Sequence, residues 1–417
     1  MKKIFKIILY SILVIVALPL TFIVVTQAWF YAGYPIYSFQ EPQPFSGDYF
    51  YNPYTNVVHS DWRKSLFHTH TESWFGLTHG DNNREELLDV YHALGYEVVA
   101  ISNYMTVDTG GMHLPCYIPC YEHGYGYGKT HQMPMGNHGP VLWRDYIFVQ
   151  NSLSQKQYTL DLLKPRCEVL AINHPDLRYG YTPEDFKYLC NYDLMEVLNG
   201  VRHSVKYWDS ALSHGHAAWI TANDDSHGVN DLKWVQREVI FVNSPTTNRA
   251  DILHNLSHGA AFAVSFSQIP EATLAEKQSI AGKVSFPESI TVRHDSLIVK
   301  WQQNLSSITF IGDGGQVLAS AHQTDYAVYP IKSQDTYIRV ELKDDEHGFT
   351  YYLNPAVRTP DGNVPAKQQL ASVNAGKTMF KRITILLCVL FAGGGIWWLR
   401  RKVIKVQGKG YKVKGTR

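Results

Sequence analysis

Hydrophobic residues form a first long run near the N-terminus, where residues 7 to 25 carry no charge and follow three lysines. About 20 such residues, rising 1.5 Å each in a helix, cross a hydrocarbon core of ~30 Å. A cleaved signal peptide is the alternative, but its apolar region is shorter, roughly 7–15 residues. We therefore predict a cytoplasmic N-terminus over residues 1–6 and an uncleaved transmembrane helix over residues 7–27.

A second apolar run covers residues 383–399 and ends in Trp397 and Trp398, where an aromatic belt would meet the membrane interface. This run is short for a span, and a basic tail, residues 400–417, follows it. Because cytoplasmic flanks carry the excess of Lys and Arg, the pattern predicts two membrane helices with both termini in the cytoplasm. The alternative interpretation of the tail is a patch that binds nucleic acid or lipid.

Between the two apolar runs the hydrophobic pattern changes along the chain. After a lead-in at residues 28–62, residues 63–266 alternate between short apolar runs and helical periods. One example is the helical pattern of residues 84–95, which is followed by the strand-like "EVVAIS" at residues 97–102. Repeated strand–helix alternation predicts an α/β fold with a parallel sheet or barrel.

The following segment has a different period. After a linker at residues 267–284, residues 285–358 alternate as antiparallel strands do, with "GDGG" at a turn. This pattern predicts a small antiparallel β-sandwich. A polar linker at residues 359–382 then leads to the second apolar run.

Charge is distributed unevenly between the ends and the middle of the chain. Fourteen of the 38 basic residues, and no acidic residue, lie before residue 7 or after residue 376, which leaves 24 basic against 37 acidic residues, a formal charge of −13, in between. An acidic middle segment repels polyanions. The composition therefore excludes nucleic acid as a partner.

Cysteine usage fits an oxidising compartment. Four of the five cysteines lie in the segment predicted to be outside the cytoplasm, namely Cys116, Cys120, Cys167 and Cys190. Disulfides are allowed there, and four cysteines permit three pairings between which the sequence does not choose. The alternative for the "CYIPC" pair is a metal site, although no second cysteine pair with zinc-ribbon spacing follows it.

Residues able to bind metal ions recur where strands are predicted to end. His68 and His70 follow the first strand, and the period of a strand places both side chains on one side. Further candidates at strand ends and in a Gly- and Tyr-rich loop are Glu122, His131, His174, Asp225 and His227. In a parallel barrel such positions gather at one end, and imidazole with carboxylate suits Zn²⁺, Mn²⁺ or Fe²⁺.

The chain resembles the PHP (polymerase and histidinol phosphatase) domain family over roughly residues 63–266, about half of its length. The family opens with His-x-His after a strand, which His68 and His70 match, and "HGDNNREELL" places His79 at the next ligand position. Glu122 matches the family's bridging glutamate. The remaining matches are His131 with Gly136, "INHPD" with His174, "EVLNG" at residues 196–200, and "NDDSH" with Asp225 and His227.

The resemblance implies a distorted (β/α)7 barrel that holds two to three divalent metal ions. It implies a first metal held by His68, His70, Glu122 and Asp225, and a second held by Glu122, His131 and His174. A third site would involve His79, His227 and the position where the family usually has the histidine of an Asp-His pair. This chain has Asn103-Tyr104 there. Tyr104 then ligates as a phenolate, lines the pocket, or marks a two-metal enzyme.

The same resemblance implies a metal-dependent phosphoesterase. Together with the two apolar runs it predicts a membrane-anchored, extracytoplasmic enzyme acting on a small or envelope-derived phosphorylated substrate. The catalytic residues would be His68, His70, Glu122, Asp225 and His227. Candidate phosphate ligands beyond the strand ends are Arg178, Arg202 and His203. Two alternatives stay open: an inactive scaffold that binds a partner or lipid, and a metal-dependent hydrolase of a non-phosphate bond.

Overall fold

The computed structural model describes residues 2–76, 78, 80–147, 151–266, 271–293 and 295–409, with the side chains of 2–13, 392–393, 396 and 399–409 left aside. The chain forms two compact units. Unit 1 combines Met1–Ser38 with Ser372–Arg417, and unit 2 is Phe39–Ala371. A two-stranded sheet of β1 (Tyr37–Phe39) and β16 (Ala371–Val373) lies at the boundary in the chain.

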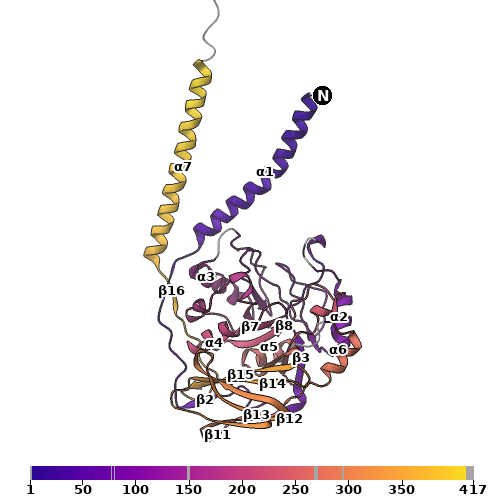
Figure 1. Ribbon diagram of the computed structural model, residues 1–417. Coiled ribbons are helices and arrows are strands. Elements are labelled where there is room, and N and C mark those ends of the chain that lie inside the picture. The colour runs from indigo at the N-terminus through magenta and orange to yellow at the C-terminus, as the bar shows by residue number, and fades with distance from the viewer. Residues whose placement is uncertain are drawn as a thin grey trace, which may run out of the picture. The chain divides into compact units, whose positions relative to one another are not determined.

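Unit 1 contains two long helices, α1 (Lys2–Gly33) and α7 (Ala375–Lys409) (Figure 1). Within the described residues, one stretch is long and apolar enough to cross a membrane, Val14–Gly33 in α1, with a mean hydropathy of 1.9. It is compatible with either a signal sequence or an anchor. The prediction of a second span is not supported, because only 17 residues, 383–399, separate Arg382 from Arg400, fewer than the roughly 20 that a helix needs to cross the hydrocarbon core.

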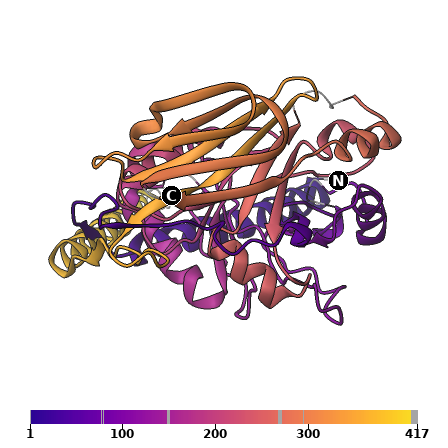
Figure 2. The same ribbon diagram turned by 90° about the horizontal axis from the view of Figure 1, so that it is seen from below.

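Unit 2 is built on two sheets. The larger has ten strands, with the hydrogen-bonded order β11-β12-β14-β15-β10-β9-β3-β4 and with β13 and β2 joined to β12 and β15. Its strands are β2 (Tyr49–Tyr51), β3 (Trp62–Leu66), β4 (Val98–Val99), β9 (Glu238–Asn243), β10 (Ala261–Phe266), β11 (Pro287–Arg293), β12 (Ser296–Ile311), β13 (Val317–Pro330), β14 (Tyr337–Asp344) and β15 (Phe349–Thr359). Figure 2 shows the long antiparallel strands β12 and β13 side by side in one layer.

The smaller sheet has the order β5-β6-β7-β8, with β6, β7 and β8 parallel. Its strands are β5 (Gln132–Met135), β6 (Val169–Ile172), β7 (Leu194–Asn199) and β8 (Trp219–Asn223). The helices of unit 2 are α2 (Arg84–Ala93), α3 (Leu153–Leu163), α4 (Val205–Ser213), α5 (Arg249–Ser257) and α6 (Leu274–Ala281). Short 3-10 helices occur at η1 (His59–Asp61), η2 (Trp74–Gly76), η3 (Lys164–Arg166), η4 (Leu177–Tyr179), η5 (Pro183–Lys187), η6 (Leu232–Trp234) and η7 (Asp313–Gly315).

The predicted closed (β/α)7 barrel is not present as one sheet among the described residues. Strands β3 and β4 belong to the larger sheet and β5 to β8 to the smaller one. The sheet leaves the barrel path because β9 runs antiparallel to β3, and β10 then pairs along five residues with β15. Pairing with β15 satisfies backbone groups that an open edge at β10 would expose. The fold is therefore α/β in its first part, with its sheet continued by the antiparallel strands.

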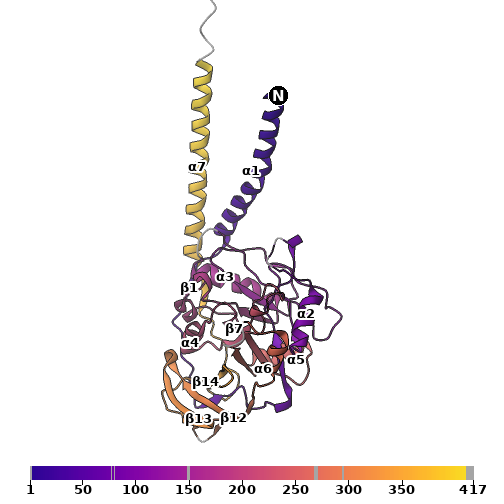
Figure 3. The same cartoon turned by 45° about the vertical axis from the view of Figure 1, so that its right-hand side comes forward.

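Two apolar cores stabilise unit 2. One core packs β5 to β8 against α3, α4 and α5, and the other packs α2 and β9 to β15. A buried ion pair joins α4 to β14, since Arg339 donates to both carboxylate oxygens of Asp209 at 2.7 and 2.9 Å. Figure 3 shows β12, β13 and β14 at the end of unit 2 opposite α3.

Candidate metal centre

Five chain segments meet where the two sheets approach each other. The segment after β3 carries His68 and His70, and the segment after β8 carries Asp225. These two segments are held together by hydrogen bonds from the Asp225 amide to the His68 carbonyl, at 3.0 Å, and from the His70 amide to the Ser226 carbonyl, at 2.9 Å. Glu122 forms an isolated bridge with Tyr104, in the segment after β4, and that segment is linked to the one after β3 by the Ser102 amide, which donates to the Thr69 carbonyl at 3.0 Å. Backbone pairing therefore brings residues distant in the sequence to one place.

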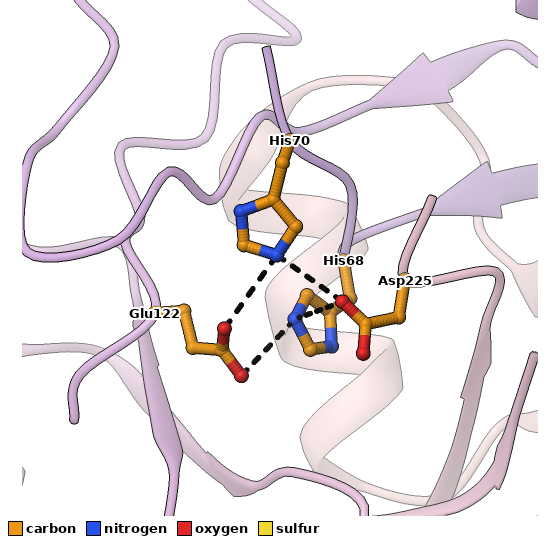
Figure 4. Close-up of side chains that lie close together, drawn as sticks. All are labelled: His68, His70, Glu122 and Asp225. Atoms are coloured by element: carbon orange, nitrogen blue, oxygen red, sulfur yellow. Dashed lines mark hydrogen bonds and ion pairs between the residues drawn. The ribbon is translucent and has the colours of Figure 1, made fainter. Parts of the chain in front are cut away.

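The first group of ligand atoms contains His68, His70, Glu122 and Asp225, all buried (Figure 4). The Nε2 atoms of both histidines lie 3.1 Å from Oδ1 of Asp225. Nε2 of His68 also lies 3.2 Å from Oε1 of Glu122, and Nε2 of His70 lies 3.5 Å from Oε2 of Glu122. Four donor atoms of types that transition metals prefer thus converge, as the alternation of the His-x-His pair predicts.

A second group shares Glu122 with the first and adds His131 and His174. Oε1 of Glu122 lies 2.7 Å from Nδ1 of His131 and 2.9 Å from Nε2 of His174. His131 stands just before β5 and His174 just after β6, and the Asn173 amide donates to the His131 carbonyl at 3.2 Å. The carboxylate of Glu122 therefore lies between two sets of imidazoles, as a bridging ligand would.

One acidic residue behind the site fixes the orientation of a histidine. Nδ1 of His68 lies 2.9 Å from Oε1 of Glu196, in β7, which leaves Nε2 directed at the first group. Glu196 also accepts from Nδ2 of Asn199 and Asn223 and from the His174 amide, at 2.9 to 3.1 Å. Carboxylate–imidazole pairs of this kind set the tautomer of metal-binding histidines. The sequence match at residues 196–200 marks this strand but does not reveal the contact.

The electrostatics of the site favour binding of a cation. Burial would raise the pKa values of Glu122 and Asp225, but neighbouring imidazoles, including that of His68, hold both below their usual range. Burial would likewise lower the pKa of His68, yet the surrounding carboxylates raise it well above its usual value. Oε2 of Glu122 and Nε2 of His131 are buried without a hydrogen-bond partner among the described residues. Buried ionised oxygens beside free imidazole nitrogens fit divalent metal ions.

The backbone is strained at two of the candidate ligands. His174 has φ 27° and Asp225 has φ 50°, both in the left-handed region. Such conformations cost on the order of 1–3 kcal/mol and concentrate at functional sites. Gly124 contributes a related constraint, because a Cβ atom there would lie 2.5 Å from Cδ2 of His131 and φ is +123°.

Of the two histidines predicted for a third metal, the structure describes one. His79 lies outside the described residues. His227 stacks on His70 with ring centroids 4.4 Å apart, and its Nε2 lies 3.8 Å from Oδ1 of Asp225. Burial is the main cause that lowers the pKa of His227 to about 4, and electrostatic interaction with the nearby His70 adds to it. The imidazole of His227 is therefore neutral at pH 7.

Tyr104 occupies the position of the expected histidine and covers the first group. Its ring stacks on His70, with centroids 4.5 Å apart and planes 20° apart. Burial raises the pKa of Tyr104 above its usual value, and the charges of Glu122 and Asp225 add to this effect. A protonated hydroxyl that bonds to Glu122 fits a pocket-lining role better than a phenolate ligand.

Two cations lie at the mouth of the site. Nζ of Lys129 stands 5.1 Å from the ring centroid of Tyr104, and Arg178 acts electrostatically on the same tyrosine. The structure records no ion pair for either cation within the described residues. The sequence marks Arg178 as a candidate phosphate ligand, because it follows a predicted strand end. Nothing in the local sequence pattern marks Lys129. Of the other candidates, His203 pairs with Glu238 at 2.8 Å and Arg202 is exposed.

Two other features bear on where chemistry occurs. All five cysteines are free, so no disulfide supports the fold and the "CYIPC" pair does not join the metal-ligand groups found among the described residues. A groove of about 940 Å³ lies between α4 and strands β12 to β14, and it is lined by none of the candidate ligands. The ligand geometry, and not cavity size, locates the site.

Comparisons with known proteins add a distant likeness. No family model and no curated protein matches the chain. Among solved structures, the chain is similar to a two-domain protein from Bacteroides vulgatus containing a predicted PHP-like metal-dependent phosphoesterase. The identity is 12% and the TM-score 0.36, with 80% of this chain and 100% of that chain covered. The function is therefore argued from the geometry of the site.

Proposed function

We propose that the protein is a metal-dependent phosphoesterase with two divalent ions in unit 2. The observation that carries the proposal is the buried Glu122 carboxylate between two ligand groups, His68, His70 and Asp225 on one side and His131 and His174 on the other. A shared carboxylate is what a pair of closely spaced ions needs. Zn²⁺, Mn²⁺ and Fe²⁺ all suit this mixture of imidazole and carboxylate.

Divalent ions at these positions supply Lewis acidity and lower the pKa of water towards 7. The residues of the chain do the rest. Glu196 holds His68 in the orientation that directs Nε2 at the site. Tyr104 covers His70 and limits access of water, and its hydroxyl is a donor beside Glu122.

Lys129 and Arg178 favour a phosphoryl substrate over a neutral one. Both are cations at the mouth, and the structure records no carboxylate partner for them among the described residues. A phosphoryl group that is attacked in the site would place its non-bridging oxygens near these side chains, where charge-assisted hydrogen bonds form. A hydrolase of a neutral substrate does not account for these two cations. A scaffold that binds an anionic lipid would use them as well, and it differs from the enzyme in lacking metal-dependent turnover.

We propose further that α1 is retained as an anchor, with unit 2 outside the cytoplasm. The apolar stretch Val14–Gly33 and the three lysines before residue 7 support this orientation. A phosphatase reporter fused after residue 360 would then be active, and an inactive, well-expressed fusion would refute the orientation. The cytoplasmic C-terminus predicted from the sequence requires the second span that the described residues do not support.

The proposed function is tested by measuring hydrolysis of a phosphate ester and of a carboxylate ester by the full-length, metal-loaded protein and its variants. We expect hydrolysis of an aryl phosphate but not of the matching aryl acetate. Lys129→Ala and Arg178→Ala should each lower kcat/KM by roughly 10- to 150-fold, the value of a charge-assisted hydrogen bond of about 1.5–3 kcal/mol. Lys233→Ala, which removes a half-buried lysine that pairs with Asp231 and lies outside the candidate ligand groups, is the matched control. Cleavage of the acetate alone, or of neither compound by metal-loaded protein, would contradict the proposal.

A further inference from the structure

The mouth of the metal site carries large aromatic side chains that are exposed to solvent. We name Trp74, Phe75, Tyr127 and Trp143 the aromatic rim; their exposed fractions are 39%, 101%, 78% and 52%. Scattered exposed apolar residues are common on protein surfaces, but several large rings around one site mark an interaction surface.

Contacts link three of the rim residues to the site or to its cations, and Phe75 follows Trp74 directly in the chain. The Trp74 indole N–H donates to the Tyr104 carbonyl at 2.8 Å, and Tyr104 stacks on the candidate ligand His70. Trp74 also packs on Trp143, with ring centroids 5.5 Å apart. On the other side, the Arg178 guanidinium lies 5.5 Å from the ring centroid of Tyr127. Trp74 and Tyr127 therefore contact Tyr104 and Arg178 respectively, and Trp143 adjoins Trp74, so these rings lie near the two cations.

The loops hold these rings outwards at a conformational cost. Trp74 and Phe75 have φ 53° and 57°, and Lys129 and Arg178 have φ 56° and 48°. The left-handed region is unfavourable for residues with a side chain, and bulky aromatic residues rarely adopt it. Phe75 thus has its whole ring in solvent although its backbone adopts a conformation that bulky aromatic residues rarely take.

We propose that the aromatic rim docks on a lipid bilayer surface and that the substrate is an amphiphilic phosphoester of that bilayer. The inference rests on the proposed function and names its substrate class. Trp and Tyr favour the membrane interface, where their rings meet both apolar and polar groups, and Phe75 has the chemistry of an inserted wedge. Lys129 and Arg178 complement anionic head groups at the same surface.

The short link between α1 and unit 2 supports a lipid surface, and not a soluble molecule, as the partner of the aromatic rim. The apolar stretch in α1 ends at Gly33 and unit 2 begins at Phe39, so six peptide steps separate them. At about 3.6 Å per step they span at most about 22 Å. With α1 retained in a membrane, unit 2 is therefore confined to the vicinity of the lipid surface, which raises the effective concentration of membrane substrates.

The first experiment compares two substrates for the full-length protein in phosphatidylcholine vesicles that contain phosphatidylglycerol. Phe75→Ser should lower kcat/KM for phosphatidic acid about tenfold more than for a water-soluble aryl phosphate, the loss expected from one large apolar side chain that no longer inserts. Val317→Ser is the matched control, because Val317 is an exposed apolar residue of β13, away from the mouth. Equal losses of kcat/KM on both substrates would overturn the inference. So would a higher kcat/KM of the wild type for a soluble sugar phosphate, assayed in the same vesicles, than for phosphatidic acid.

The second experiment does not depend on activity. Brominated lipids quench tryptophans that reach the bilayer, so replacing Trp143 by Phe should remove part of the quenching seen with the wild-type protein in the same vesicles. Unchanged quenching would refute docking through the rim. If the wild type hydrolyses neither substrate yet Trp143 is quenched, the proposed function fails and the docking surface stands.

Discussion

Nδ1 of His68 lies 2.9 Å from Oε1 of Glu196, while Nε2 of the same ring faces Glu122 and Asp225. If His68 binds a metal ion, as we propose, this pair makes it a preoriented ligand and not a flexible one. Because all the partners are buried, the orientation is fixed before any ion arrives. Preoriented ligands lose little freedom on binding, which favours tight metal binding.

Replacing Glu196 by Gln should weaken metal binding without removing a ligand. We expect about a 10- to 100-fold loss of affinity, as is typical when the carboxylate partner of a metal-bound histidine is lost. Competition titration with a chelating dye measures it. The matched control is Glu238→Gln, which alters the pair of a buried glutamate with the exposed His203, outside the candidate ligand groups. Equal losses in both variants would indicate a general effect on folding.

Gly124→Ala should empty the second ligand group selectively. The added Cβ would press on the ring of His131, and φ +123° strains any residue other than glycine. We expect the variant to bind one metal equivalent fewer, measured by elemental analysis of the purified protein. Gly128→Ala, in the same loop, meets nothing closer than 4.0 Å and should bind as the wild type does. A full metal complement in Gly124→Ala would show that His131 is not a ligand.

Tyr104→Phe should keep the metal complement. The phenyl ring retains the stacking on His70, and the lost hydrogen bond to Glu122 is worth about 0.5–1.5 kcal/mol, a two- to tenfold change in affinity. Titration with Co²⁺ followed by absorbance measures both stoichiometry and affinity. Loss of a whole equivalent would instead show that Tyr104 ligates as a phenolate.

Asp193 gives a pH dependence of stability. Burial would raise its pKa, but ion pairs with Lys367 and Lys164 lower it. A depressed carboxyl pKa stabilises the fold above the unfolded value of about 3.9, and this contribution disappears as the pH falls through the folded pKa. Asp193→Asn should therefore cost about 1–3 kcal/mol at pH 7, less than a fully buried pair because both lysines are partly exposed.

Urea unfolding of the detergent-solubilised protein at several pH values tests this dependence. The difference between wild type and Asp193→Asn should narrow below pH about 4. Asp231→Asn, at an exposed ion pair with Lys233, is the control and should show no measurable difference at any pH. A difference between wild type and Asp193→Asn that stays constant down to acid pH would contradict the assignment.

The sequence marks the candidate ligand groups because their members lie near the ends of strands. The strands before His68, His174 and Asp225 are short, and each of these three residues lies two positions after the end of its strand. What the sequence did not reveal depends on contacts between distant segments. The pairing of β10 with β15, which joins the predicted sandwich to the sheet, has no local signal. The same holds for Lys129 over Tyr104 and for the contact of Glu196 with His68.

The most direct test of the account is the metal content of the purified full-length protein, measured together with hydrolysis of an aryl phosphate. We expect at least two tightly bound divalent ions per chain. Turnover should fall to background in His68→Ala and Asp225→Ala, each of which should also lose bound metal. Protein that is folded and binds no divalent ion would contradict it, as would turnover that both variants retain.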